Sequence, residues 1–517
     1  MIGAHLINGG TLAVNEIPVL GIDGFRGWVC EAVSAGATLA ALFGHPLPAG
    51  AGDGAGAGAG AGKVRLVAVL TWPLDGCLEV LAADAGDTYR ALTPDCPSAH
   101  WFEREIAEQW GIRPEGHPWL KPIRYHPSWR PGRDAWGRPA GGEILPCVTD
   151  FYRVEGEEVH EVAVGPVHAG VIEPGHFRFQ CHGETVFHLE IALGYQHRGV
   201  EPALAGGPGP RTMALMETLA GDTTVGHGLA YAQLVEGLAG CRVPARAMAI
   251  RAVGLELERL ANHVGDLGAL ANDVGFLPTA SYCGRLRGDF LNLSALLCGS
   301  RFGRGLVRPG GVAFDLEPAR VDSLKARLVP IVADVGNAVN LLWTASSVMA
   351  RFEETGTVDR ATAVQLGLVG PAARASGFER DVRMEFPTGF YRFQQVPVAS
   401  LPGGDVFARA YVRWLEVQRS EAFIAQALAG LPPGPVRAEL PGPLAPDRFA
   451  VSLTEGWRGE ICHVAQTDAA GKFAWYKVVD PSFHNWMGLA MSLRDQPISD
   501  FPLCNKSFNL SYCGHDL

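Results

Sequence analysis

The chain has 517 residues, of which 47% are hydrophobic and 19% charged, and its formal net charge is −11 at pH 7. One hydrophobic core does not usually organise so long a chain, so we expect two or three domains. The acidic balance argues against a nucleic-acid partner, which needs clustered Lys and Arg. Eleven cysteines without any Cys-x-x-Cys pair favour reduced thiols over a disulfide framework.

The first predicted region is a small α/β unit. Residues 30–43 are expected to be helical, and the runs VRLVAVLTW (64–72) and LEVLAAD (78–84) to be strands. An Ala/Gly repeat at residues 49–62 cannot bury apolar surface, so we expect a mobile loop there. Prolines spread over residues 117–146 break regular elements and indicate a linker.

Strand patterns and helix patterns then follow in turn. Residues 155–193 alternate like hairpin strands around a Gly/Pro turn at 173–175. From about residue 211 to 430, apolar residues recur at three- and four-residue steps, which is typical of amphipathic helices packed in a bundle. Strands return at 450–464 and 472–479, and we expect one short helix and an irregular tail after them.

The most apolar helical stretch covers residues 328–350, and charged or amide side chains interrupt it at Asp334, Asn337 and Asn340. It therefore predicts a buried bundle helix and no membrane span. Together the patterns predict an α+β protein: a small N-terminal α/β domain (1–125), a linker (126–150), and a long-helix bundle flanked by β-hairpin and α+β pieces (151–517).

Two regions carry a family resemblance. FEREIAEQWGI (102–112), followed by EGHPWL (115–120), resembles the signature of the 30-kDa subunit of respiratory complex I. Its charged helical turn and His-Pro turn indicate a docking corner without catalytic groups, and the alternative is a solvated charged helix.

From about residue 160 the chain resembles the 49-kDa subunit of complex I and the large subunit of nickel-iron hydrogenases. The matching motifs stand in the family's order: GPVH (165–168), PGHFR (174–178), HRGVE (197–201), ELERLANH (256–263), RPGGV (308–312), RASG (374–377), GWRGE (456–460) and KVVDPSF (477–483). The fused arrangement is most similar to large subunits of the formate-hydrogenlyase, or energy-converting hydrogenase, type. The resemblance implies a small partner subunit with an iron–sulfur cluster, membrane subunits related to ion antiporters, and a cytoplasmic, peripheral place on the inner face of the cell membrane.

In the hydrogenases of this family, the stretch ETLAGDTTVGH (217–227) carries Cys-Gly-x-Cys, and the chain end carries Cys-x-x-Cys. Aligned on the His at the end of that stretch, the four ligand positions fall on Ala220, Thr223, Leu510 and Cys513. Nickel and iron in such a site are held by soft sulfur ligands, and three of the four are missing. We therefore expect neither a nickel-iron centre nor any tightly bound cofactor.

By the same resemblance, the family's other chemistry is quinone reduction, in which a Tyr on this helix and a His in the early hairpin loop approach the headgroup. The Tyr position falls on Gly221, and the His survives as His176 or His168. Asp222 and Thr223 would leave a polar mouth for a quinone or a proton path. The alternative is that they cap or kink a buried helix.

Two further residues match charged positions of the family. Arg458 resembles an arginine placed over the metal pocket, and a surface pair with Glu460 is the alternative. Glu201 resembles a carboxylate near the active centre, where it could relay protons or pair with Arg198 or another arginine.

Other polar residues favour structural roles. His227 belongs to the predicted pocket mouth, yet it lies on a helical stripe and, like His263, favours a satisfied core histidine. We expect a structural ion network lining a subunit interface from Arg374, Asp381, Asp405, Arg409 and Arg413.

The sequence thus predicts the large subunit of a membrane-associated, complex-I-like or hydrogenase-related oxidoreductase complex, which works in electron transfer or in quinone and proton coupling. The candidate pocket residues are His176, His168, Arg458 and Glu201, and the vestigial mouth is formed by Gly221, Asp222, Thr223 and His227. Two alternatives stay open: a non-catalytic scaffold subunit, and an active nickel-iron hydrogenase with unusual ligands.

Overall fold

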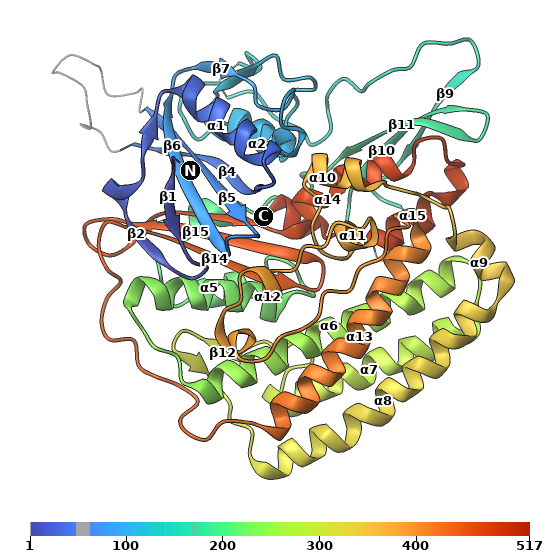
Figure 1. Cartoon of the computed structure of the whole chain (residues 1–517). Helices are drawn as coiled ribbons and strands as arrows, with labels where there is room; N and C mark the ends of the chain where they lie inside the picture. Colours follow the sequence, from blue (N-terminus) through green and yellow to red (C-terminus); the bar gives the residue numbers. More distant parts are fainter. Residues whose placement is uncertain (1, 48–62, 140, 169–171) are drawn as a thin grey trace.

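The computed structural model describes residues 2–47, 63–139, 141–168 and 172–517. Figure 1 shows an N-terminal sheet with its helices in blue, a central antiparallel sheet around β14 and β15, and long helices below them. This arrangement confirms the predicted α+β class. The Ala/Gly loop predicted at residues 49–62 lies outside the described residues.

The N-terminal sheet has the strand order β1-β6-β5-β4, and β3 pairs with β6 in parallel. Its region comprises β1 (Ala4–Leu6), η1 (Val14–Glu16), β3 (Val19–Leu20), α1 (Ile22–Ser34), β4 (Thr38–Pro46), β5 (Val64–Trp72) and β6 (Cys77–Ala85). The strands predicted at residues 64–72 and 78–84 are confirmed as β5 and β6. Helix α1 packs against both of them.

The helix predicted over residues 30–43 is wrong beyond residue 34. Helix α1 ends at Ser34, and the chain turns at Gly36, whose φ is +104°. Glycine adopts a positive φ without the strain of a Cβ, so this position stops the helix. The residues that follow form β4, which is buried on both faces and shows no alternation that would reveal a strand.

Helix α2 (His100–Trp110) is buried from residue 101 to residue 110, so the alternative of a solvated charged helix is wrong. Glu103 and Glu108 on this helix accept hydrogen bonds from backbone amides of the loops on either side. Its short neighbours are β7 (Thr88–Arg90), η2 (Pro97–Ala99) and β8 (Arg113–Glu115). The charged residues of α2 therefore hold the loops at residues 92–93 and 123–125 in place.

The hairpin strands predicted within residues 155–193 are confirmed as a three-stranded antiparallel sheet. Its order is β11-β10-β9, with β9 (Val159–Val164), β10 (His176–His182) and β11 (Thr185–Ala192). In Figure 1 this sheet extends from the side of the molecule, beyond α14.

The predicted bundle is confirmed, and α6 lies at its centre. The long helices are α5 (Thr224–Ala239), α6 (Ala245–Asp273), α7 (Leu277–Cys298), α8 (Pro318–Thr344) and α13 (Val406–Ala429). The shorter elements around them are α3 (Val200–Leu204), α4 (Thr212–Met216), β12 (Val307–Arg308), β13 (Gly311–Val312), α9 (Ser346–Phe352), α10 (Arg360–Leu366), α11 (Gly370–Ala375), α12 (Val382–Glu385) and η3 (Gly389–Arg392). Helix α6 packs against both α7 and α13, as Figure 1 shows.

The helix predicted over residues 328–350 is only partly as expected. It ends at Thr344, and Val329 and Leu341 are 58% and 55% exposed, so only one face of α8 is buried. None of the helices in the described ranges passes, alone, the length and hydropathy test for a membrane span. Helices α8 and α9, bent by 81° at their junction, pass it as a pair.

The C-terminal strands form a sheet of order β16-β15-β14-β2, so the N-terminal strand β2 pairs with β14. These strands are β2 (Thr11–Ala13), β14 (Arg448–Gly456), β15 (Gly459–Thr467) and β16 (Phe473–Val479). The one short helix expected after the strands is confirmed as α14 (Pro481–Ser492). The irregular tail expected after it is wrong, because that tail holds η4 (Ile498–Asp500), α15 (Phe501–Phe508) and α16 (Tyr512–Asp516). Asp480 and Ser511 cap α14 and α16 through their side chains, which explains why polar residues here do not indicate a coil.

The predicted ion network lies inside the chain rather than along a subunit interface. Arg374 is fully buried among Glu416, Glu455 and Asp381, with contacts of 2.6, 2.8 and 3.7 Å. The other predicted members are at most 8% exposed and make separate contacts: Asp405 caps α13, Arg409 bonds Ser507, and Arg413 pairs with Asp266.

Candidate functional site

The stretch at residues 217–227 and the C-terminal tail meet at the start of α5. Arg458, in the turn between β14 and β15, donates from Nε to the backbone oxygen of Asn509 at 2.5 Å. The thiol of Cys513 lies within hydrogen-bonding reach of the backbone amide of Gly221. The structure therefore brings together the two segments that the sequence marks as the former ligand sites.

Arg458 forms a bidentate ion pair with Asp222, with Nη1–Oδ1 at 2.6 Å and Nη2–Oδ2 at 2.8 Å. Its guanidinium carbon lies 3.9 Å from the centre of the Trp457 ring, and the side chain is 6% exposed. Burial alone would lower the pKa of Arg458, but the Asp222 carboxylate raises it above the usual value. The surface pair with Glu460 is wrong, because Glu460 lies 3.7 Å from Arg380 instead.

An open cavity of about 450 Å³ adjoins this pair. Among the residues lining it are Glu173, Tyr195, Gln196, Thr218, Gly221, Arg304 and Cys513. Of the predicted mouth residues only Gly221 lines the cavity. Thr223 is 1% exposed and lies 3.4 Å from Arg458, and Asp222 pairs with that arginine.

Glu173 is a member of this site that sequence reasoning treated only as part of a turn. Its carboxylate accepts hydrogen bonds from the backbone amides of Tyr512 and Cys513 at 3.4 and 3.3 Å. Burial, with Glu173 adding to it, raises the pKa of the Cys513 thiol to about 11. The thiol is therefore protonated at neutral pH. In the sequence, only the position of Glu173 directly before the motif PGHFR could have indicated that this residue belongs to the site.

The two candidate histidines do not line the cavity. His176 begins β10, where its Nδ1 lies 3.3 Å from the Gly165 oxygen and its Nε2 accepts from Arg178 Nε at 3.3 Å. Burial lowers its pKa. His168 lies in the preceding loop, with its ring 6.2 Å from that of Phe177. Their roles stay predictions.

Glu201 pairs with Lys477 at 2.8 Å, so the alternative of a pair with Arg198 is wrong. Lys477 also contacts Glu105 of α2 at 2.6 Å, and Glu105 pairs with Arg124. Arg198 instead donates to the backbone oxygens of residues 218 and 219, beside the cavity. Glu201 is thus part of a buried ionic chain that joins α2 to β16.

His227 is fully buried and does not line the mouth. Its Nε2 lies 2.9 Å from Asp480 and its Nδ1 3.1 Å from Nε2 of His463, whose Nδ1 lies 2.8 Å from the Tyr476 hydroxyl. Burial holds the pKa of His463 well below its usual value. The prediction of a satisfied core histidine is confirmed for His227. Its two partners, His463 and Asp480, were missed because they lie on a strand and at a helix cap far along the chain.

Glu258 of α6 lies directly behind the ion pair. It accepts hydrogen bonds from the backbone amides of Val225 and Gly226, at the start of α5, at 2.7 and 3.1 Å. Burial raises the pKa of this carboxyl from 4.5 to about 8, and the charge of Asp222 contributes in the same direction. Glu258 is therefore protonated at neutral pH.

Replacing Glu258 with Gln is expected to flatten the pH dependence of stability. Because the folded-state pKa of about 8 exceeds the value of 4.5, stability contributed by the protonated carboxyl is full below pH 4.5 and declines as the pH rises toward 8. The thermal midpoint of the wild type should fall more than that of the variant between about pH 5.5 and about pH 8.5. The exposed Glu31→Gln serves as control. Parallel curves for the wild type and Glu258→Gln would contradict the assignment.

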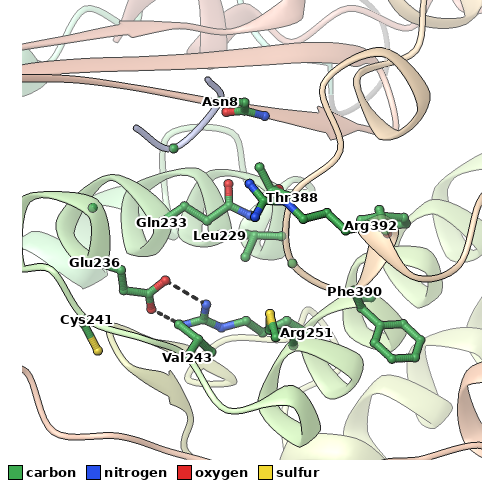
Figure 2. A pocket seen from close by; sticks show the side chains of 16 residues that line it. Asn8, Leu229, Gln233, Glu236, Cys241, Val243, Arg251, Thr388, Phe390 and Arg392 are labelled. Carbon is green, nitrogen blue, oxygen red and sulfur yellow. Dashed lines mark hydrogen bonds and ion pairs between the residues drawn. The ribbon is translucent and has the colours of Figure 1, made fainter. Parts of the chain in front are cut away.

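Figure 2 shows a different pocket, of about 220 Å³, between α5, α6, η3 and the N-terminal segment at Asn8. Its charged groups Glu236 and Arg251 pair with each other at 2.5 Å, and Gln233 bonds Thr388 at 2.9 Å. None of the predicted site residues lines it. Since its interior polar groups already have partners, this pocket is a weaker candidate than the cavity at Gly221.

Comparison with known proteins agrees with this architecture. Residues 63–138 match the family "Respiratory-chain NADH dehydrogenase, 30 Kd subunit", and residues 273–452 match "Respiratory-chain NADH dehydrogenase, 49 Kd subunit". The chain is 30% identical over 435 residues to formate hydrogenlyase subunit 5 of Escherichia coli (strain K12), covering 82% of this chain and 76% of the relative. The chain belongs to this family of fused complex I 30-kDa and 49-kDa subunits. The predicted resemblance is thereby confirmed.

Two other relatives extend the comparison of this fused subunit. A carbon monoxide-induced hydrogenase of Rhodospirillum rubrum is 31% identical over 353 residues, which cover 68% of this chain and 97% of the relative. A chain in the structure of the membrane-bound sulfane sulfur reductase, an archaeal respiratory membrane complex, has a TM-score of 0.66 at 24% identity. That match covers 71% of this chain and 100% of the other, and it shows a shared fold.

Proposed function

We propose that this chain is the large subunit of a membrane-associated oxidoreductase complex in which an ion-paired wall has replaced the family's metal pocket and the adjoining cavity receives a quinone headgroup. The observation that carries the proposal is the Arg458–Asp222 pair, whose arginine is buried between the two proposed former ligand segments, next to the cavity. Arg458 also bonds the backbone oxygen of Asn509, so its guanidinium and the Asp222 carboxylate have fixed positions in this wall.

The residues present do not fit a nickel-iron centre. The four ligand positions hold a methyl group, a hydroxyl, an isobutyl group and one thiol. The Thr223 hydroxyl bonds Asp222 at 3.2 Å, and Leu510 is 4% exposed within the core. Cys513 supplies one soft sulfur ligand where such a site needs four. No step is therefore assigned to such a centre.

The cavity offers groups suited to a headgroup with two carbonyl oxygens. Arg304 and Gln196 can donate hydrogen bonds to such oxygens, and Tyr195 carries a hydroxyl whose pKa burial raises, so that it keeps its proton. Reduction of a quinone to a quinol consumes two electrons and two protons. The protonated thiol of Cys513 and the neighbouring Glu173 stand where a proton could be held. Electrons would come from the iron–sulfur cluster of a partner subunit.

The assembly implied by this proposal has a cluster-bearing small subunit and membrane subunits related to ion antiporters, on the cytoplasmic face of the membrane. The shared fold with a chain of a membrane-bound respiratory complex supports it. Charge coupling would use the Arg458–Asp222 pair, since the pKa of Glu258 behind it is raised to about 8.

Replacing Gly221 with Trp should block the cavity. A Cβ at Gly221 meets no atom within 4 Å, so the variant folds and its ring occupies the space. In the purified complex, the KM for a short-chain quinone is expected to rise about tenfold or more, because the ring keeps the headgroup away from its hydrogen-bond partners. Electron transfer to a small artificial acceptor should stay unchanged. Gly284→Trp, at another open glycine, is the matched control.

Two results would overturn the proposal. Stoichiometric nickel in the purified complex would restore the alternative of an active hydrogenase with unusual ligands. A KM for the short-chain quinone that is unchanged in Gly221→Trp would favour the alternative of a non-catalytic scaffold subunit.

A further inference from the structure

A larger cavity, of about 640 Å³, lies between α2, β11 and α14, and none of the predicted site residues lines it. Its wall is mainly aromatic and apolar, with Trp101, Trp119, Tyr152, Phe187, Leu366 and Trp486 among the lining residues. A volume and composition of this kind are typical of small-molecule sites. Three polar groups among the residues of this wall, one guanidinium and two indole N–H donors, lack partners that buried groups normally have.

The first is the guanidinium of Arg104, which is 6% exposed. Its Nε and Nη2 donate to the backbone oxygens of Lys121 and Pro122 at 2.8 and 3.0 Å, and it lies 4.6 Å from the centre of the Trp101 ring. In the part of the chain that the structure describes, no carboxylate lies within 4 Å of it, and its Nη1 has no hydrogen bond. Burial lowers its pKa to about 10, so it remains charged at neutral pH.

The other charges at the cavity do not neutralise Arg104. Glu190 lines the wall, but it is paired with Lys121 at 2.6 Å. Arg494 stands exposed at the rim, without an ion pair among the described residues. Burial lowers the pKa of His188 and, well below its usual value, that of His100, so both rings are neutral. The cavity therefore has an excess of positive charge, and a buried unpaired cation is costly.

The second and third groups are the indole N–H donors of Trp101 and Trp486. Both side chains are less than 9% exposed, both line the cavity, and neither Nε1 has a hydrogen-bond partner among the described residues. Buried donors are usually satisfied, and an unmade bond costs free energy. Both nitrogens are enclosed in the wall itself, so the unpaired guanidinium of Arg104 is the group that an anion in the cavity would meet.

We propose that this cavity binds an amphipathic anion, in which an aromatic or aliphatic body carries one carboxylate or phosphate group. The anionic oxygens pair with the Arg104 guanidinium, and the body lies along the aromatic wall. Arg494 at the rim attracts the anion from solvent. The inference does not depend on the proposed quinone site.

The test compares 1-pyrenebutyrate with 1-pyrenebutanol, which share one body and differ in the charge of the head. Fluorescence titration of the full chain and of the purified complex should give about tenfold or more tighter binding of the anion, as expected for a charge-assisted hydrogen bond. Arg104→Gln should abolish this preference, whereas Arg104→Lys should keep part of it. Ala490→Trp, which fills the cavity, should abolish the binding of both probes.

Arg327→Gln and Ala326→Trp, on exposed positions of α8, are the matched controls and should change neither affinity. Competition then identifies the source: displacement by octanoate indicates a soluble carboxylate, and displacement by dihexanoyl phosphatidylglycerol indicates an acidic lipid. Equal affinity for the two probes, or a preference that survives Arg104→Gln, would overturn the proposal. So would binding by the isolated chain that disappears in the complex, because a partner subunit would then cover the cavity.

Discussion

Replacing Arg374 with Met is expected to destabilise the chain by about 3–5 kcal/mol, or to prevent folding. Arg374 donates to Glu416 at 2.6 and 3.0 Å and to Glu455 at 2.8 Å, and it lies 3.7 Å from Asp381. All four side chains are at most 2% exposed. Met fills a similar volume but leaves three buried carboxylates without their central cation.

The measurement for Arg374 is the urea midpoint of the full chain, followed by far-UV circular dichroism and tryptophan fluorescence. The control is Arg285→Met on the exposed face of α7, where the ion pair with Asp289 lies in solvent and should contribute little. Burial alone would raise the pKa of Glu416, but Arg374 and the other neighbouring cations hold it well below its usual value. A variant with wild-type stability would show that the remaining arginines suffice.

Replacing Lys477 with Met should have a comparable effect, about 3–5 kcal/mol, for the same reason. Lys477 is 3% exposed and lies between Glu105 of α2 and Glu201 of α3, at 2.6 and 2.8 Å. Its loss removes the cation that ties α2 to β16. Limited proteolysis should then cleave within residues 126–150 faster than in the wild type, because α2 is less firmly held.

The Lys477 effect also has a defined pH dependence. Burial alone would raise the pKa of Glu105, but the charges of Lys477 and Arg124 lower it below the model-compound value of 4.5. Stability from this pairing is therefore present above pH 4.5 and is lost as the pH falls through the folded-state pKa. The difference between wild type and variant should shrink in acid. Lys472→Met, at an exposed position, is the control, and a difference that is constant with pH would contradict the assignment.

Some elements of the fold were predictable because local sequence decides them. The density of β-branched residues in β5 and the apolar stripe of α6 can each be recognised within the element itself. Strand β4 and the tail helices α15 and α16 were not predictable in this way. Strand β4 contains Ala and Leu residues that favour a helix, and burial on both faces leaves no alternation that would indicate a strand. The side chain of Ser511 caps α16.

The candidate site divides similarly. Motif order located Arg458, Gly221 and Cys513 within the chain, and in the structure the segments that carry them are in contact. Motif order could not pair Arg458 with Asp222, which lies 236 residues away. A short polar contact depends on two backbones approaching each other, and spacing within one element contains no information about that approach.

By itself, the sequence determined the family and the strands and helices that local sequence controls, and it predicted that three of the four sulfur ligand positions hold other residue types. Only the tertiary structure decided which charges neutralise each other, that Glu201 meets Lys477 rather than Arg198, and that the guanidinium of Arg104 remains unpaired beside an aromatic cavity. Residue types and their order are local properties. Burial and pairing depend on the distances that packing sets between segments far apart in the chain.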